Sequence, residues 1–153
     1  MVDTHVEFYT QHKISPVRLD ISNLDLHLEN REGLFRHLGI LPGLITGKRI
    51  LEFGPGSGFN SIHLASLEPK SLTLVDGNPT GLEQAKDLYA KFPTYKNFIK
   101  YEYSMFDDYQ NEEKFDLVIM ENVLVGQPDI DKTLRHVASF VAPGGLFVTS
   151  CLN

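Results

Sequence analysis

The sequence contains a single cysteine, Cys151, among its 153 residues. An internal disulfide is therefore excluded, and a reducing compartment fits this composition, so we expect a cytoplasmic protein. The first residues carry no apolar signal core, and no apolar run approaches the length of a membrane span. We therefore expect no membrane partner.

Basic charge is also scarce, because 14 lysines and arginines stand against 20 aspartates and glutamates, which gives a formal net charge of −6. Binding to a nucleic-acid backbone needs a basic face, so we expect no nucleic-acid partner. The six histidines are scattered, and no pair of them has metal-ligand spacing supported by a carboxylate. We therefore expect no metal site.

What the sequence does contain is a glycine-rich segment at residues 48–60, where an apolar strand pattern runs into three glycines at alternate positions. Glu52 stands near the end of the strand, and Gly54, Gly56 and Gly58 follow it. Glycine lets the backbone turn sharply and approach a ligand closely, and the apolar helical pattern that follows begins with free N–H groups. The segment predicts a cradle for a small molecule.

The spacing of these glycines argues against a dinucleotide site. That site requires Gly-x-Gly-x-x-Gly, whereas Phe59 occupies the third position here and Gly58 comes one residue early. No lysine or arginine stands beside the turn to neutralise a pyrophosphate. A nicotinamide-dependent oxidoreductase is therefore disfavoured.

The rest of the chain alternates strand and helix patterns. Further strands are predicted at Ser71–Asp76, Phe98–Tyr103, Phe115–Glu121 and Leu146–Cys151, with helices around Leu82–Tyr89 and Ile130–Val141. Such alternation predicts an α/β fold with a doubly wound, Rossmann-like parallel sheet covered on both faces. Right-handed crossovers then give the strand order 3-2-1-4-5, with the ligand crevice between the first and fourth strands.

The length predicts one domain preceded by an N-terminal segment. Residues 1–46 contain a helical face of Leu28, Leu34, Phe35 and Leu38, closed by Gly39. We interpret residues 1–46 as a helical lid over one end of the sheet, and residues 47–153 as the ligand-binding domain.

Over residues 47–151 the chain resembles the class I S-adenosylmethionine-dependent methyltransferases. The resemblance is carried, in order, by Leu51–Gly58, Leu74–Asn78, Phe115–Ile119 and Pro143–Leu146. It implies S-adenosylmethionine as the cofactor and methyl transfer to an O, N or C atom of a small-molecule acceptor.

The resemblance also implies where the cofactor binds. Asp76 matches the ribose ligand, and Glu52 matches the acid at the methionine end. The remaining positions implied for cofactor contacts are Gly54, Pro55, Gly56, Gly58, Gly77, Asn78, Met105, Phe106, Glu121 and Asn122. Gly77 and Met105 depart from the usual adenine pattern, which leaves the adenine contacts open. No catalytic residue is identified, and Glu121 is a weak candidate for a base.

Two alternatives remain open. A non-catalytic S-adenosylmethionine-binding domain or fragment would have the same cradle without a complete acceptor site, and a polyamine-synthase-like transferase would share the fold and the ribose acid. The family's hairpin after the fifth strand is absent from this sequence, so that strand is expected to be an uncovered edge. We therefore predict self-association through this edge.

Overall fold

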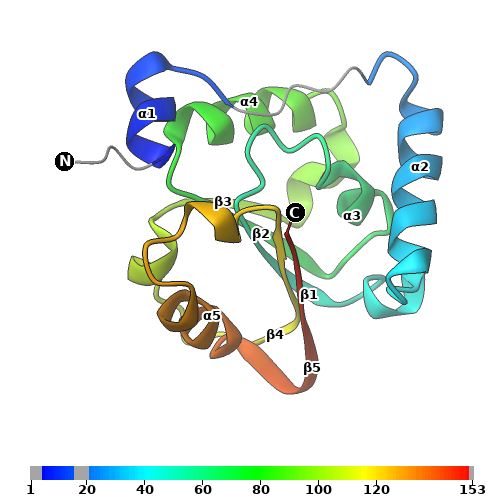
Figure 1. Cartoon of the computed structure of the whole chain (residues 1–153). Helices are drawn as coiled ribbons and strands as arrows, with labels where there is room; N and C mark the ends of the chain where they lie inside the picture. The colour runs from blue at the N-terminus through cyan, green and yellow to red at the C-terminus, as the bar shows by residue number, and fades with distance from the viewer. Residues whose placement is uncertain (1–4, 16–20, 152–153) are drawn as a thin grey trace.

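A computed structural model describes residues 5–15 and 21–151 of the chain. Its centre is a five-stranded sheet in which all neighbouring strands run parallel (Figure 1). The strands are β1 (Arg49–Phe53), β2 (Ser71–Asp76), β3 (Ile99–Tyr103), β4 (Phe115–Glu121) and β5 (Val141–Ser150). Their order is β3-β2-β1-β4-β5, which confirms the predicted α/β topology.

Helices cover both faces of the sheet. They are α1 (His5–His12), α2 (Leu24–His37), α3 (Ile62–Ser66), α4 (Pro79–Tyr89) and α5 (Ile130–Ala138). Short 3₁₀ turns lie at Pro42–Leu44, Pro93–Asn97, Phe106–Asp108 and Leu124–Gly126. No helix in the described parts of the chain is long and apolar enough to cross a bilayer.

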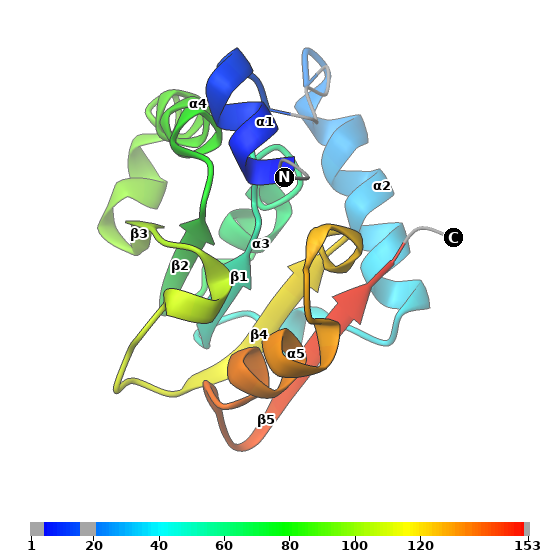
Figure 2. The ribbon, with the colours of Figure 1, turned by 60° about the vertical axis from the view of Figure 1, so that its left-hand side comes forward.

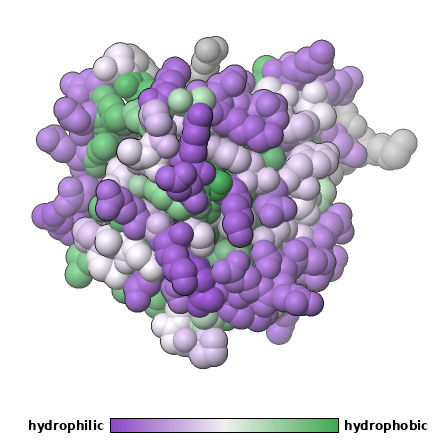
Figure 3. Space-filling view, turned by 180° about the vertical axis from the view of Figure 1, so that it is seen from behind, coloured by the Kyte–Doolittle hydropathy of each residue, from purple (hydrophilic) through white to green (hydrophobic). Residues whose placement is uncertain are grey.

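The core consists of two apolar layers, because successive side chains of a strand point to opposite faces. Ile50 of β1 packs with α2, α3 and α4 in one layer, where Phe35 and Leu88 are also buried. Leu51 and Phe53 point into the other layer, which α5 and the turn at Phe106–Asp108 cover. Seen from behind, the surface is mostly hydrophilic, with smaller apolar areas (Figure 3).

The fifth strand begins earlier than the sequence suggested. It starts at Val141 instead of Leu146, and its pairing with β4 shifts register between Phe115 and Leu117. The Pro-Gly-Gly segment forms this irregularity, with Gly144 at a φ of +76°. A Cβ on Gly145 would lie 2.9 Å from the carbonyl oxygen of Asp116, so glycine is needed where the two backbones meet.

The two helices of the N-terminal segment lie in different places. Helix α2 packs against a face of the sheet through Phe35, whereas Leu34 and Leu38 of the predicted apolar face are 41% and 50% exposed. Helix α1 lies beside α4, on the side toward which the strand arrowheads point (Figure 2). Helix α1 and residues 13–15 are therefore positioned over the carboxyl end of the sheet.

Candidate cofactor site

The glycine turn after β1 is held in a conformation that favours glycine. Gly54, Gly56 and Gly58 have φ angles of +74°, +54° and +77°. A Cβ on Gly54 would collide with Val123, and one on Gly58 would lie 2.9 Å from the ring of Tyr89. These two glycines are therefore required for packing within the chain.

Gly56 faces the N-terminal segment instead. Its nearest side-chain neighbour is Ser15, whose Oγ would be 3.4 Å from a Cβ at this position. That hydroxyl oxygen is buried and has no hydrogen-bond partner among the described residues. The Pro55 carbonyl accepts from the Gly58 N–H at 2.9 Å and closes the turn. The open side of the turn is thus at Gly56.

Asp76, at the carboxyl end of β2, ties this turn to the neighbouring strand. Its Oδ2 accepts from the Gly56 N–H at 2.9 Å, and its Oδ1 accepts from the Asn78 N–H at 2.8 Å. Burial raises the pKa of the Asp76 carboxyl, and these two N–H groups act in the opposite direction. Each carboxylate oxygen has a second lone pair, so the group can also accept from a ligand hydroxyl.

Glu52, near the carboxyl end of β1, is a buried acid without full hydrogen bonding. The residue is 3% exposed, and its Oε2 has no partner in the described structure. Burial raises the pKa of the carboxyl to about 7, while the Ser61 hydroxyl and Arg31 act to lower it. A cation placed beside this carboxylate would satisfy it.

The carboxylate at the end of β4 is paired with an arginine of α2. The Glu121 oxygens accept from both terminal nitrogens of Arg31, at 2.7 and 2.6 Å. The Arg31 Cζ also lies 5.0 Å from the centre of the Phe35 ring. Arg31 was not among the residues predicted from the sequence, although a charged residue on an otherwise apolar helical face indicates a buried partner.

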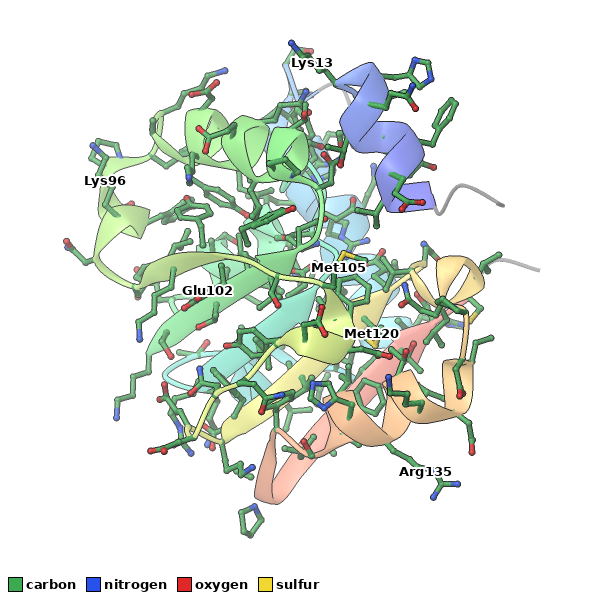
Figure 4. All side chains as sticks on the ribbon, turned by 90° about the vertical axis from the view of Figure 1, so that its left-hand side faces the viewer. Lys13, Lys96, Glu102, Met105, Met120 and Arg135 are labelled. Carbon is green, nitrogen blue, oxygen red and sulfur yellow. The ribbon has the colours of Figure 1, made fainter. Side chains whose placement is uncertain are left out.

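The segment after β2 contacts the N-terminal segment. The Asn78 Oδ1 caps α4 by accepting from the Thr80 N–H at 3.1 Å, and its Nδ2 donates to the Ile14 carbonyl at 2.9 Å. Met105 lies near the carboxyl end of the sheet, in the loop after β3 (Figure 4). A Cβ on Gly77 would be 2.7 Å from the Met105 Sδ, so the missing side chain makes room for the thioether.

The structure thus gathers the predicted site residues at one edge of the sheet, and two of them make contacts that explain them within the fold. Phe106 is buried in the core, with its ring centre 5.5 Å from that of Phe53. Asn122 has a φ of +58°, and its Oδ1 accepts from the Ser150 hydroxyl of β5 at 3.4 Å. Within the described residues, no group of three potential metal ligands occurs.

Comparison with known proteins supplies the family. A model described as "Methyltransferase domain" matches residues 27–153. The ubiquinone biosynthesis O-methyltransferase of Vibrio atlanticus is 31% identical over 153 residues, which cover 99% of this chain and 56% of that protein. The chain therefore spans about half the length of this curated relative.

Solved structures agree in fold. N-methyltransferase NodS from Bradyrhizobium japonicum has a TM-score of 0.73 at 22% identity, over 96% of this chain and 72% of the NodS chain. The CcbJ methyltransferase from Streptomyces caelestis has a TM-score of 0.67 at 25% identity, over 82% of this chain and 49% of that one. The chain therefore belongs to the methyltransferase domain family, with the Rossmann-like fold of class I S-adenosylmethionine-dependent methyltransferases.

Proposed function

We propose that this chain binds S-adenosylmethionine and transfers its methyl group to an O, N or C atom of a small-molecule acceptor. The observation that carries the proposal is the buried Glu52 carboxylate, which has one oxygen without a hydrogen-bond partner among the described residues. We place the cofactor in a crevice bordered by this carboxylate, Asp76 and the glycine turn. The cofactor offers complementary groups, because it has a ribose diol, an ammonium and a sulfonium. An acidic crevice suits the two cationic centres.

Each residue of the crevice then has a proposed role. Asp76 accepts from the ribose hydroxyls, Glu52 binds the ammonium, and the backbone at Gly56 borders the bound cofactor. Arg31 is suited to the cofactor carboxylate, because its side chain is 9% exposed and its Nε is buried without a partner. Met105 and Gly77 are proposed to border the adenine.

When bound, the cofactor would supply an electrophilic methyl group, and its sulfur would leave with the C–S electron pair as the acceptor lone pair takes the methyl carbon. This chain contributes by orienting the reactants, which can supply much of the rate. Glu121 is the proposed base for the acceptor proton. Its carboxylate keeps two lone-pair sites beyond those that Arg31 occupies.

We propose that α1 and residues 13–15 act as a lid. The hydrogen bond from Asn78 to the Ile14 carbonyl and the position of Ser15 against Gly56 support this role. Residues 13–15 lie next to the loop after Asp76 and next to the glycine turn. A ligand that binds between these two segments therefore has to displace Ser15 or fit underneath it. The proposed cytoplasmic location, and the proposed absence of nucleic-acid and membrane partners, rest on composition alone.

The alternative is a domain that binds S-adenosylmethionine without turning it over, because the chain spans only 56% of the Vibrio relative. A thermal scan tests binding first. At a hundredfold excess over the dissociation constant, ligand binding adds about 2.7 kcal/mol to the unfolding free energy. We expect S-adenosylmethionine and S-adenosylhomocysteine to raise the melting temperature by roughly 5–10 °C. A shift with NAD alone would reject the proposal, and binding without methyl transfer to any acceptor would favour the alternative.

A further inference from the structure

A hollow of about 230 Å³ lies between α2 and the last residues of β4 and β5. Leu34 and Leu38 form its helical wall, and Ile119 and Val148 form its floor on the sheet. The hollow ends at Glu121, the residue that closes β4. Because the proposed function places the acceptor beside this carboxylate, the hollow adjoins the proposed acceptor position on the side of the fifth strand.

The walls have a consistent chemistry. Leucine, isoleucine, valine and phenylalanine side chains make up most of the lining, and polar groups gather where the strands end, at Glu121, Asn122 and Ser150. Apolar surface that is left open to water is costly, and an apolar ligand of matching size removes that cost. The hollow therefore suits a ligand that is apolar along most of its length and polar at one end.

The volume limits the size of that ligand. A cavity of about 150 Å³ lined by similar residues is enough for benzene. The larger hollow here suits a single six-membered ring with one or two small substituents, and it is too small for a fused multi-ring system to enter completely.

The polar end of the hollow, at Glu121, favours an uncharged hydrogen-bond donor on the ligand. The charge of Glu121 is already matched by the two hydrogen bonds from Arg31. The carboxylate keeps lone-pair sites for a hydroxyl, whereas an ammonium would bring a second positive charge close to the guanidinium. The preferred group is therefore an uncharged O–H.

We infer that this hollow binds the ring of the methyl acceptor, and that the acceptor is a phenol-like molecule whose hydroxyl faces Glu121. This inference rests on the proposed function and names the acceptor class for the same site. The methyl carbon would bond to the phenolic oxygen while its bond to the cofactor sulfur breaks and the electron pair of that bond returns to sulfur. The phenolic proton would pass to the Glu121 carboxylate and from there to water. The ring itself would stay in the apolar hollow throughout.

The test is a titration with p-cresol, followed through the methyl NMR signals of the wild-type chain loaded with S-adenosylhomocysteine. We expect saturable shifts at Ile119 and Val148, and at least tenfold weaker binding of toluene, which lacks the hydroxyl. Tyramine, which carries an ammonium on a similar ring, should bind no more tightly than p-cresol. Absence of saturable shifts with p-cresol would overturn the inference.

Two variants that fill the hollow, compared with one control variant, test where the ring binds. Val148→Phe should fill the hollow and weaken p-cresol binding at least tenfold, while Thr149→Phe, at an exposed position on the opposite face of the same strand, should leave it within twofold. Leu38→Phe, at a half-exposed wall position, provides a second filling variant if Val148→Phe does not fold. Equal p-cresol binding in the filling variants and Thr149→Phe would contradict the inference.

The result can be separated from a failure of the proposed function. Binding of S-adenosylhomocysteine is measured by calorimetry on the same samples before p-cresol is added. If the nucleoside binds and p-cresol does not, the inference fails and the proposed function stands. If the methyl shifts follow protein concentration in the absence of p-cresol, the hollow is a contact between copies of the chain, and the inference is wrong.

Discussion

Arg31 and Glu121 lie 90 positions apart in the chain, yet their side chains form two hydrogen bonds of 2.7 and 2.6 Å at the carboxyl end of β4. This ion pair joins helix α2 to the strand that borders the proposed cofactor crevice. Both side chains are mostly buried, at 9% and 17% exposure. Removing one partner therefore leaves the other charge largely without water or a counterion.

Arg31→Met should destabilise the fold by about 3 kcal/mol, the lower end of the range for a broken buried pair. In a chain of this size that corresponds to a melting temperature lower by roughly 6–12 °C. The matched control is Arg36→Met, which breaks the exposed pair with Glu32 on the same helix and should cost less than about 1 kcal/mol. Equal losses in the two variants, measured by thermal or urea unfolding, would show that the Arg31 pair has no special weight.

Glu52→Gln should change how stability depends on pH. The folded chain holds the pKa of this carboxyl at about 7 against an ordinary value of 4.5, mainly because it is buried. Between these two values the folded state binds more protons than the unfolded state, so stability falls as the pH rises through this window. Above pH 7 the ionised, buried Glu52 carboxyl lowers the free energy of unfolding by its full amount, about 3 kcal/mol.

The variant removes this cost, so it should be more stable than the wild type at pH 8 and nearly equal to it at pH 4. It should also bind S-adenosylhomocysteine more weakly, because the counterion of the ammonium is lost. Glu83→Gln, at an exposed position of α4, serves as the control and should leave the pH profile unchanged. Parallel profiles for Glu52→Gln and the wild type would mean that this carboxyl does not titrate as described.

Asn78→Ser tests the proposed lid. Serine can still cap α4, but it cannot replace the amide hydrogen bond to the Ile14 carbonyl. Hydrogen exchange should therefore become faster in α1 and in residues 13–15, with little change in α4. Asn23→Ser, which alters the cap of α2, is the control and should leave exchange in α1 unchanged. Unaltered exchange of α1 in Asn78→Ser would count against a latch at this position.

The outer edge of β5 provides a prediction about self-association. Within the described residues this strand pairs with β4 alone, and Leu146 on it is 42% exposed. We propose that the free edge pairs with another copy, so light scattering should show a mean mass that rises with concentration. Leu146→Lys should reduce this rise, because a charge on an edge strand opposes pairing. A constant monomer mass in the wild type would reject the proposal.

The sequence was sufficient for the topology because the signals for it are local. Gly54, Gly56 and Gly58 mark the turn, and the alternation of strands and helices leads to the order β3-β2-β1-β4-β5 that the structure confirms. The start of β5 was predicted wrongly, because Pro143 and Gly144 were taken as a turn, whereas the strand tolerates them through a register shift. Local patterns do not show whether a glycine pair interrupts a strand or lies within it.

The missed parts of the site depend on contacts between distant segments. Neither the pairing of Arg31 with Glu121 nor the bond from Asn78 to Ile14 has a fixed spacing in sequence. The first is set by how α2 packs on the sheet, and the second by how the segment of α1 packs beside α4. The hollow beside Val148 has the same origin, because its two walls come from α2 and β5. Side-chain roles at such positions follow from tertiary packing.

A calorimetric titration of the wild-type chain and of Asp76→Ala with S-adenosylhomocysteine tests the central claim most directly. We predict one saturable site in the wild type and at least about tenfold weaker binding in the variant, because two charge-assisted hydrogen bonds to the ribose are lost. Circular dichroism verifies that the variant is folded. Absence of binding to the wild type, or the same affinity in Asp76→Ala, would contradict the proposed cofactor site.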